Sequence, residues 1–137
     1  PHLVTEVDLN DGTVSKTEPE KSGPVLDKKT TDEVTAMLVK VVDEKIAEKH
    51  PDIKWEHYSI AAKTGTAQIP DPVKGGYYDN RYLHSFFGYF PAYNAKFLVF
   101  LYQVNPKGAE FASETLTGPF SDISKFLINY YNIAPDR

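Results

Sequence analysis

Cysteine is absent from the chain, which excludes both a disulfide framework and thiolate metal sites. A run of about 18 apolar residues is absent as well, so no segment is predicted to span a bilayer. The basic residues are scattered and the net charge is −4, so no basic stripe suits nucleic acid or an anionic membrane. The histidines lack metal-ligand spacing such as H-x-x-x-H. We therefore expect no metal, cofactor or nucleic-acid partner, and we interpret each histidine as a surface or packing residue: His2, His50, His57 and His84.

The residues that are present suffice for one folded domain. The chain has 137 residues, of which 41% are hydrophobic and 13% aromatic. That length and composition predict a globule with a core of its own rather than a disordered segment. The chain opens at Pro1 with neither an initiator methionine nor a signal peptide. We interpret it as a segment of something longer.

Local patterns predict the order of helices and strands. Asn10-Asp11-Gly12 lies between strand-like segments, which is typical of a tight hairpin. Thr30-x-x-Glu33 has capping-box spacing, and His50-Pro51 ends the helical repeat behind it. Residues 70–82 are interpreted as a loop, and Pro119 is expected to start or kink the last helix. The predicted elements are a hairpin over about 3–17, a helix over about 31–49, strands over about 56–69, 83–90 and 96–104, and a helix over about 114–131. This order predicts an α+β fold with helices packed on a mostly antiparallel sheet.

The first of the three predicted strands carries Lys63-Thr64-Gly65-Thr66. A cation, two hydroxyls and a glycine on one exposed strand can cradle a carboxylate and a developing oxyanion. K-T-G is one of three motifs of serine acyl-transfer enzymes that act on D-Ala-D-Ala peptides or β-lactams. A strand with a solvent-facing lysine and two threonines is the plain structural alternative. Gly65 argues against it, because glycine weakens a strand and often marks the close approach of a ligand or backbone.

Further segments along the chain carry a resemblance that covers it from end to end. They are Pro1-His2-Leu3-Val4, the K-T-G-T strand, Tyr77-Tyr78, His84 to Pro91, Leu98 to Tyr102, Asn105-Pro106 and Tyr130 to Pro135. In this order they resemble the C-terminal half of the transpeptidase domain of class B penicillin-binding proteins, enzymes that cross-link peptidoglycan during division or elongation. The resemblance implies a partial serine transpeptidase/β-lactamase-like fold. Ala62 stands where the family usually has glycine, and residues 46–55 replace a Gly-rich segment, which leaves the subfamily open.

The other two motifs of such enzymes, S-x-x-K and S-x-N, are absent from the sequence. The nucleophile motif needs a lysine three residues after the serine. Ser59 and Ser121 each have a lysine four residues on, at Lys63 and Lys125. Ser59 is therefore interpreted as an ordinary strand serine.

The resemblance also implies roles for the motif residues. Lys63 and Thr66 are the expected catalytic residues, and Thr64, Gly65 and Thr66 are expected to bind substrate. The two hydroxyls would hold the donor carboxylate, Lys63 would add positive potential and assist proton movement, and Gly65 would let the peptide pair along the strand. The backbone N–H of Thr66 would be one oxyanion donor.

Three hypotheses follow for the function. The chain is a segment of a D,D-transpeptidase and is inactive alone, or a non-catalytic module that binds peptidoglycan or a partner, or a fragment of a serine β-lactamase. The first implies four partners: D-Ala-D-Ala stem peptides, β-lactams, the missing N-terminal half of the domain, and a second copy of the fragment. It also implies a location at the extracytoplasmic face of the cell membrane, where an N-terminal helix outside this chain anchors the parent protein.

Overall fold

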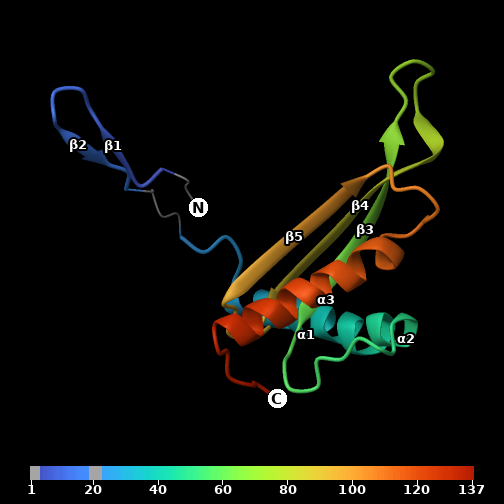
Figure 1. Cartoon of the computed structure of the whole chain (residues 1–137). Helices are drawn as coiled ribbons and strands as arrows, with labels where there is room; N and C mark the ends of the chain where they lie inside the picture. The colour runs from blue at the N-terminus through green and yellow to red at the C-terminus, as the bar shows by residue number, and fades with distance from the viewer. Residues whose placement is uncertain (1–3, 19–22) are drawn as a thin grey trace.

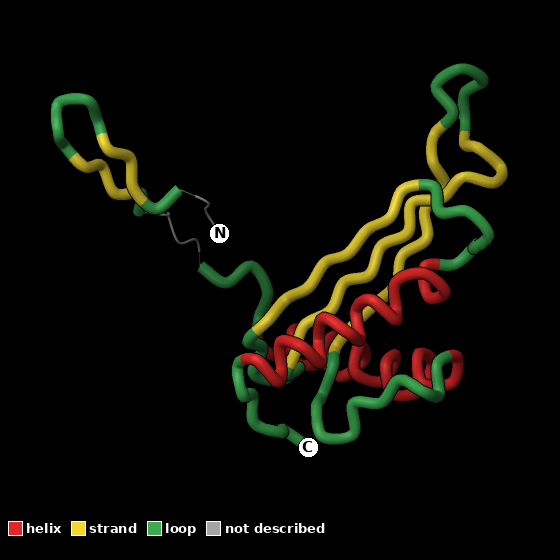
Figure 2. The backbone as a smooth tube through the Cα atoms, viewed as in Figure 1, coloured by secondary structure: helices red, strands yellow, loops and turns green. Residues whose placement is uncertain are grey.

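The computed structural model describes residues 4–18 and 23–137 (Figure 1). Pro1, His2 and Leu3 lie outside the described residues, and with them most of the opening segment of the resemblance. The elements are β1 (Glu6–Asp8), β2 (Val14–Lys16), α1 (Lys28–Lys40), the π-helical segment η1 (Val41–Ile46), α2 (Ala47–Lys49), β3 (Ala61–Pro70), β4 (Tyr77–Phe90), β5 (Phe97–Val104) and α3 (Ala112–Tyr130). The predicted α+β architecture is confirmed, with antiparallel strands and packed helices (Figure 2).

The long N-terminal helix begins earlier than its sequence pattern indicated. The side chain of Asp27 accepts a hydrogen bond of 2.7 Å from the backbone N–H of Thr30. Asp27 therefore caps α1, and the capping box predicted at Thr30 and Glu33 is wrong as the helix start. Hydrogen bonds from the backbone and side chain of Thr30 lower the pKa of Asp27. The helix continues through η1 and α2 and ends at His50, before Pro51.

The main sheet has the order β3-β4-β5, and all its strands are antiparallel. β4 begins at Tyr77, so the interpretation of residues 77–82 as loop is wrong. The carboxylate of Asp71 accepts the N–H groups of Val73 and Lys74 at 2.9 and 3.0 Å. Gly75 and Gly76 have φ of 77° and 70°, which lets the chain reverse within 71–76. Residues 56–60, predicted as strand, instead form a turn and a short extended lead into β3.

The main core is formed by the sheet, by α3 and by Val42 and Ile46 of the N-terminal helix. The Phe120 ring stacks on Phe86 at a centroid distance of 4.5 Å and meets Phe90 edge-on at 6.2 Å. A Cβ at Gly88 would lie 2.5 Å from the Phe120 ring, so only glycine lets the ring approach this closely. Pro119 lies inside α3 rather than at its start. No helix in the described ranges combines the length and apolar character that a bilayer span requires.

The other face of β5 is exposed. Every second residue of this strand points away from α3, and these side chains are 58 to 65% exposed: Leu98, Phe100, Tyr102 and Val104. We call this set the β5 apolar face. In a free domain, such a contiguous apolar surface marks an interaction site.

Candidate functional site

The K-T-G-T residues lie on an edge strand. β3 pairs with β4 on one side only, and the registers are Lys63 with Phe87, Gly65 with Ser85, and Thr66 with His84. Because side chains alternate along a strand, Lys63 and Gly65 share one face and the two threonines share the other. The second edge of β3 has no strand partner in the part of the chain that the structure describes. Its backbone groups can pair with an added extended peptide.

The glycine of the motif has a structural cause that the sequence did not reveal. A Cβ on Gly65 would lie 2.6 Å from Oγ of Ser85, on the paired strand. That hydroxyl donates to the carbonyl of Gly65 at 3.4 Å. The Ser85 side chain on β4 therefore favours glycine at position 65, and this glycine is not by itself a sign of a ligand.

Lys63 is exposed and forms none of the ion pairs found among the described residues. Its ammonium donates to the carbonyl of Thr64 at 2.9 Å. Lys63 and Thr64 also line a cavity of about 200 Å³ with four residues of the N-terminal helix and one residue of α3: Val41, Lys45, Ile46, Lys49 and Ser113. Three lysines and no acidic residue line this cavity, and one of them, Lys45, is paired with Glu48 at 3.6 Å. We call it the lysine cavity.

Thr66 is held from its inner side by the start of α3. The backbone N–H of Ala112, the first residue of this helix, donates to Oγ1 of Thr66 at 3.0 Å. The hydroxyl oxygen is thereby occupied as an acceptor, and its hydrogen is left for another acceptor. Sequence analysis did not find Ala112, because the two residues are 46 positions apart in the chain.

His84 lies beside Thr66 on β4 and is fully buried. Its Nδ1 lies 2.8 Å from Oγ1 of Thr115, and its Nε2 lies 3.0 Å from the carbonyl oxygen of Glu110. The interpretation of His84 as a packing residue is correct as far as its burial goes. Its two polar contacts were not predicted. One is to Thr115 in the first turn of α3, and the other is to Glu110, which lies two residues before the helix.

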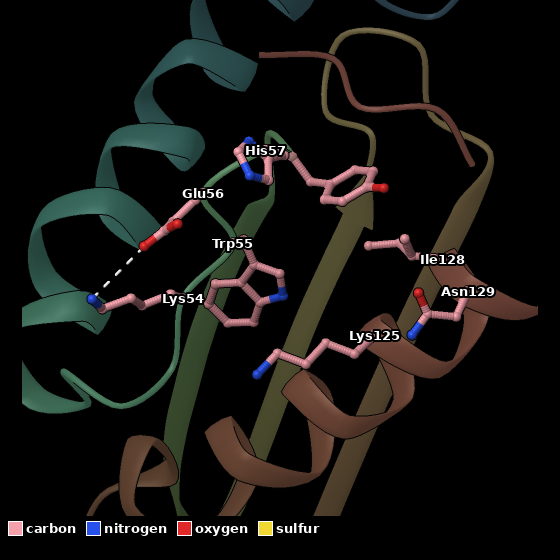
Figure 3. A pocket seen from close by; sticks show the side chains of 8 residues that line it. Lys54, Trp55, Glu56, His57, Lys125, Ile128 and Asn129 are labelled. Atoms are coloured by element: carbon pink, nitrogen blue, oxygen red, sulfur yellow. Dashed lines mark ion pairs between the residues drawn. The ribbon is translucent and has the colours of Figure 1, made fainter. Parts of the chain in front are cut away.

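A larger cavity, of about 340 Å³, lies elsewhere (Figure 3). Figure 3 shows its lining from two sides: Trp55 and its neighbours, including the ion pair of Lys54 and Glu56 at 3.7 Å, and the C-terminal half of α3 with Lys125 and Asn129. None of the K-T-G-T residues lines it. Lys63 and Thr64 thus line the lysine cavity and not this larger one, whereas Gly65 and Thr66 line neither of the two.

Ser59 is not the strand serine that its sequence context suggested. It lies two residues before β3 and is 2% exposed. Its hydroxyl donates to the carboxylate of Asp136 and accepts the N–H of Ala92 at 2.9 Å. A serine so committed is structural. Among the described residues there is also no group of three or more metal-ligating side chains.

The chain is similar in sequence to known proteins. The family model of the penicillin-binding protein transpeptidase domain matches residues 1–125. Penicillin-binding protein PbpB of Mycolicibacterium smegmatis is 28% identical over 144 aligned residues, covering 99% of this chain and 22% of that protein. Peptidoglycan D,D-transpeptidase FtsI of Buchnera aphidicola is 36% identical over 81 residues, covering 58% of this chain and 14% of that protein.

Solved structures also include proteins that are similar to this chain in fold and sequence. Penicillin-binding protein 3 of Mycobacterium tuberculosis superposes with a TM-score of 0.75 and 27% identity, covering 97% of this chain and 31% of that one. The same protein has been solved in complex with ampicillin and with aztreonam. The chain therefore spans about a fifth of the length of PbpB and less than a third of the solved structure.

Proposed function

Because the chain belongs to the penicillin-binding protein transpeptidase family, we propose that residues 1–137 form the C-terminal part of the transpeptidase domain of a peptidoglycan D,D-transpeptidase. The whole enzyme would cross-link cell-wall stem peptides through a serine acyl-enzyme. The observation that carries the proposal is the position of K-T-G-T on a free sheet edge, beside the lysine cavity. In this family that motif belongs to the reaction centre.

The two threonines would hold the terminal carboxylate of a D-Ala-D-Ala peptide. Thr64 and Thr66 lie on the same face of β3, two residues apart. Their hydroxyls would donate to the carboxylate oxygens as charge-assisted hydrogen bonds. The contact from Ala112 supports this role for Thr66, because it leaves the hydroxyl hydrogen for the ligand. Lys45, Lys49 and Lys63 would add attraction for the anion.

Lys63 and the backbone of Thr66 would act on the reaction itself. The ammonium would assist proton movement near the serine of the S-x-N motif, and the N–H of Thr66 would be one of two oxyanion donors. The second donor and the nucleophile would come from residues outside this chain, since it has no S-x-x-K. Removal of one oxyanion donor typically costs a factor of about 10² to 10³ in kcat, so the isolated chain should be inactive.

The same proposal assigns partners and a location. β-Lactams carry a carboxylate and a reactive carbonyl, and they would occupy the same cradle. The β5 apolar face would be covered by the rest of the domain, or by a second copy of the fragment when it is isolated. Cross-linking of the cell wall, in division or in elongation, places the enzyme at the extracytoplasmic face of the membrane.

Labelling with a fluorescent penicillin tests the proposal. The isolated chain should show no covalent label, whereas the whole gene product should be labelled. Covalent labelling of the isolated chain would contradict the proposal, because no serine in it should acylate. A non-catalytic binding module, the second candidate, predicts reversible peptide binding but no label in either form. A serine β-lactamase fragment predicts rapid release of the label from the whole gene product.

A further inference from the structure

We propose that His84 is a positioning residue for Thr66 and acts through the first turn of α3. The inference rests on the proposed role of Thr66 in holding a carboxylate. His84 is fully buried, and it is the β4 residue directly paired with Thr66. The side chain does not reach the free edge of β3, so it would influence the site only through its neighbours.

The hydrogen bonds of the ring fix which atoms carry protons. The carbonyl of Glu110 can only accept, so Nε2 of His84 carries a hydrogen and donates it at 3.0 Å. In the neutral imidazole, Nδ1 then accepts from the hydroxyl of Thr115 at 2.8 Å. The alternative acceptor of that hydroxyl, the carbonyl of Ala112, lies farther away at 3.4 Å. Both ring nitrogens are therefore satisfied by one short segment of chain.

That segment is the one that holds Thr66. Glu110 precedes Ala112 by two residues and Thr115 follows it by three, so His84 contacts the chain on both sides of the N–H that donates to Thr66. The carboxylate of Glu114 accepts the N–H of Glu110 and that of Phe111, at 3.1 and 2.9 Å, and closes the turn from outside. With this turn fixed, the N–H of Ala112 is fixed in place.

A histidine that only filled space would not need this geometry. A leucine or phenylalanine would supply the same buried volume, and the nearby core uses such residues, as at Phe86. A buried polar ring is costly unless both nitrogens are paired. Both ring nitrogens of His84 are hydrogen-bonded to the segment that leads into α3 and forms its first turn. The ring therefore fixes the orientation of this segment against β4.

The experiment compares two variants with one matched control in the full chain. Thr115→Val removes the hydroxyl that contacts Nδ1, and His84→Gln keeps a donor in the direction of Glu110 but loses the Nδ1 contact. Thr117→Val is the control, because Thr117 is also buried in α3 and donates to the carbonyl of Ser113 at 2.8 Å, whereas the ring of His84 pairs with Thr115 and Glu110. Amide hydrogen exchange and NMR shifts of Ala112 and Thr66 are measured together with thermal stability. Reversible binding of N-acetyl-D-Ala-D-Ala is measured in the same samples.

We expect Thr115→Val and His84→Gln to raise the exchange rate of the Ala112 amide about fivefold relative to the rest of α3 and to weaken peptide binding about threefold, as expected for one hydrogen bond. Thr115→Ser should restore both values. Thr117→Val should lower thermal stability without a selective change at Ala112 or Thr66. Uniform changes across α3 in all three variants would overturn the inference. If the wild-type chain does not bind the peptide, the proposed role of Thr66 fails, and the exchange data still decide the role of His84.

Discussion

The carboxylate of Asp136 accepts hydrogen bonds from both the backbone N–H and the hydroxyl of Ser59. Ser59 also receives the N–H of Ala92, in the connection from β4 to β5. Beside this contact, Arg137 donates to both carboxylate oxygens of Asp43 at 2.6 and 2.9 Å. The last two residues of the chain thus join the lead-in to β3, the sheet and the N-terminal helix.

Asp136→Ala should lower the free energy of unfolding by about 2 kcal/mol, because it leaves two donors of a buried serine without their charged acceptor. The measurement is urea unfolding followed by the fluorescence of Trp55. Asp122→Ala is the matched control, since Asp122 is exposed on α3 and should change stability by less than about 0.5 kcal/mol. Equal effects of the two substitutions would contradict the assigned role of Asp136.

Gly65→Ala should destabilise the chain by about 1–2 kcal/mol, because the new methyl group would lie against Oγ of Ser85. Ser85→Ala in the same chain should recover most of that loss, and a double-mutant cycle measures the coupling. Gly118→Ala serves as the comparison: no atom lies within 4 Å of its added Cβ, and alanine favours a helix. If Ser85→Ala gives no rescue, then the clash is not the reason for glycine in the motif.

Protonation of Asp27 should weaken α1 at low pH. Its pKa is lowered in the folded chain by hydrogen bonds from Thr30, so its contribution to stability is present above the unfolded value of about 3.8. That contribution is lost as the pH falls through the lower folded value. The stability difference between the wild type and Asp27→Asn should therefore shrink from pH 7 toward pH 2. A constant difference for Asp27→Asn would exclude this linkage.

Lys49→Gln and Lys45→Gln should each weaken reversible binding of N-acetyl-D-Ala-D-Ala about twofold at low salt, because both lysines line the lysine cavity. The effect should disappear at about 1 M salt, where charges are screened over about 3 Å. Lys29→Gln is the control on the same helix, because Lys29 is exposed and paired with an acidic residue, as Lys45 is, but does not line the lysine cavity. Equal losses in all three variants would indicate a general charge effect.

The isolated chain should associate with itself through the β5 apolar face. Phe100→Lys places a charge at the centre of that face and should shift the chain toward monomer in light scattering at about millimolar protein. Lys107→Ala, on the loop after β5, should leave association unchanged. A wild-type chain that stays monomeric at that concentration would rule out this expectation.

The sequence predicted the parts of the fold that depend on neighbouring residues. The hairpin signal at Asp11-Gly12 lies between β1 and β2, and His50-Pro51 ends the helix as expected. The start of β4 was not predicted. The chain reverses at Asp71, whose carboxylate accepts a backbone N–H, and this turn brings Tyr77 opposite Pro70 of β3. Such a bond between a side chain and the backbone is not visible in the residue pattern. The family and the motif strand were identified from residue order alone.

The supports of the candidate site were not predicted, for a physical reason. Ala112 reaches Thr66 through a backbone N–H, and no pattern of residue types records a backbone contact between distant segments. Ser85 and His84 appear in the sequence as ordinary members of a strand. Their roles follow from the pairing register, which places Ser85 opposite Gly65 and His84 opposite Thr66. This register is known only from the folded structure.

The packing of Phe120 has a consequence for the order of events during synthesis. α3 follows every strand in the chain, yet its Phe120 ring contacts Phe86 and Phe90 on β4 and Trp55 before β3. While a ribosome is still making α3, Trp55, Phe86 and Phe90 lack the Phe120 ring that packs on them in the folded chain. The nascent segment therefore passes through a stage with exposed aromatic surface, when aggregation and capture by chaperones are most probable. Its core closes only after translation has moved past residue 120.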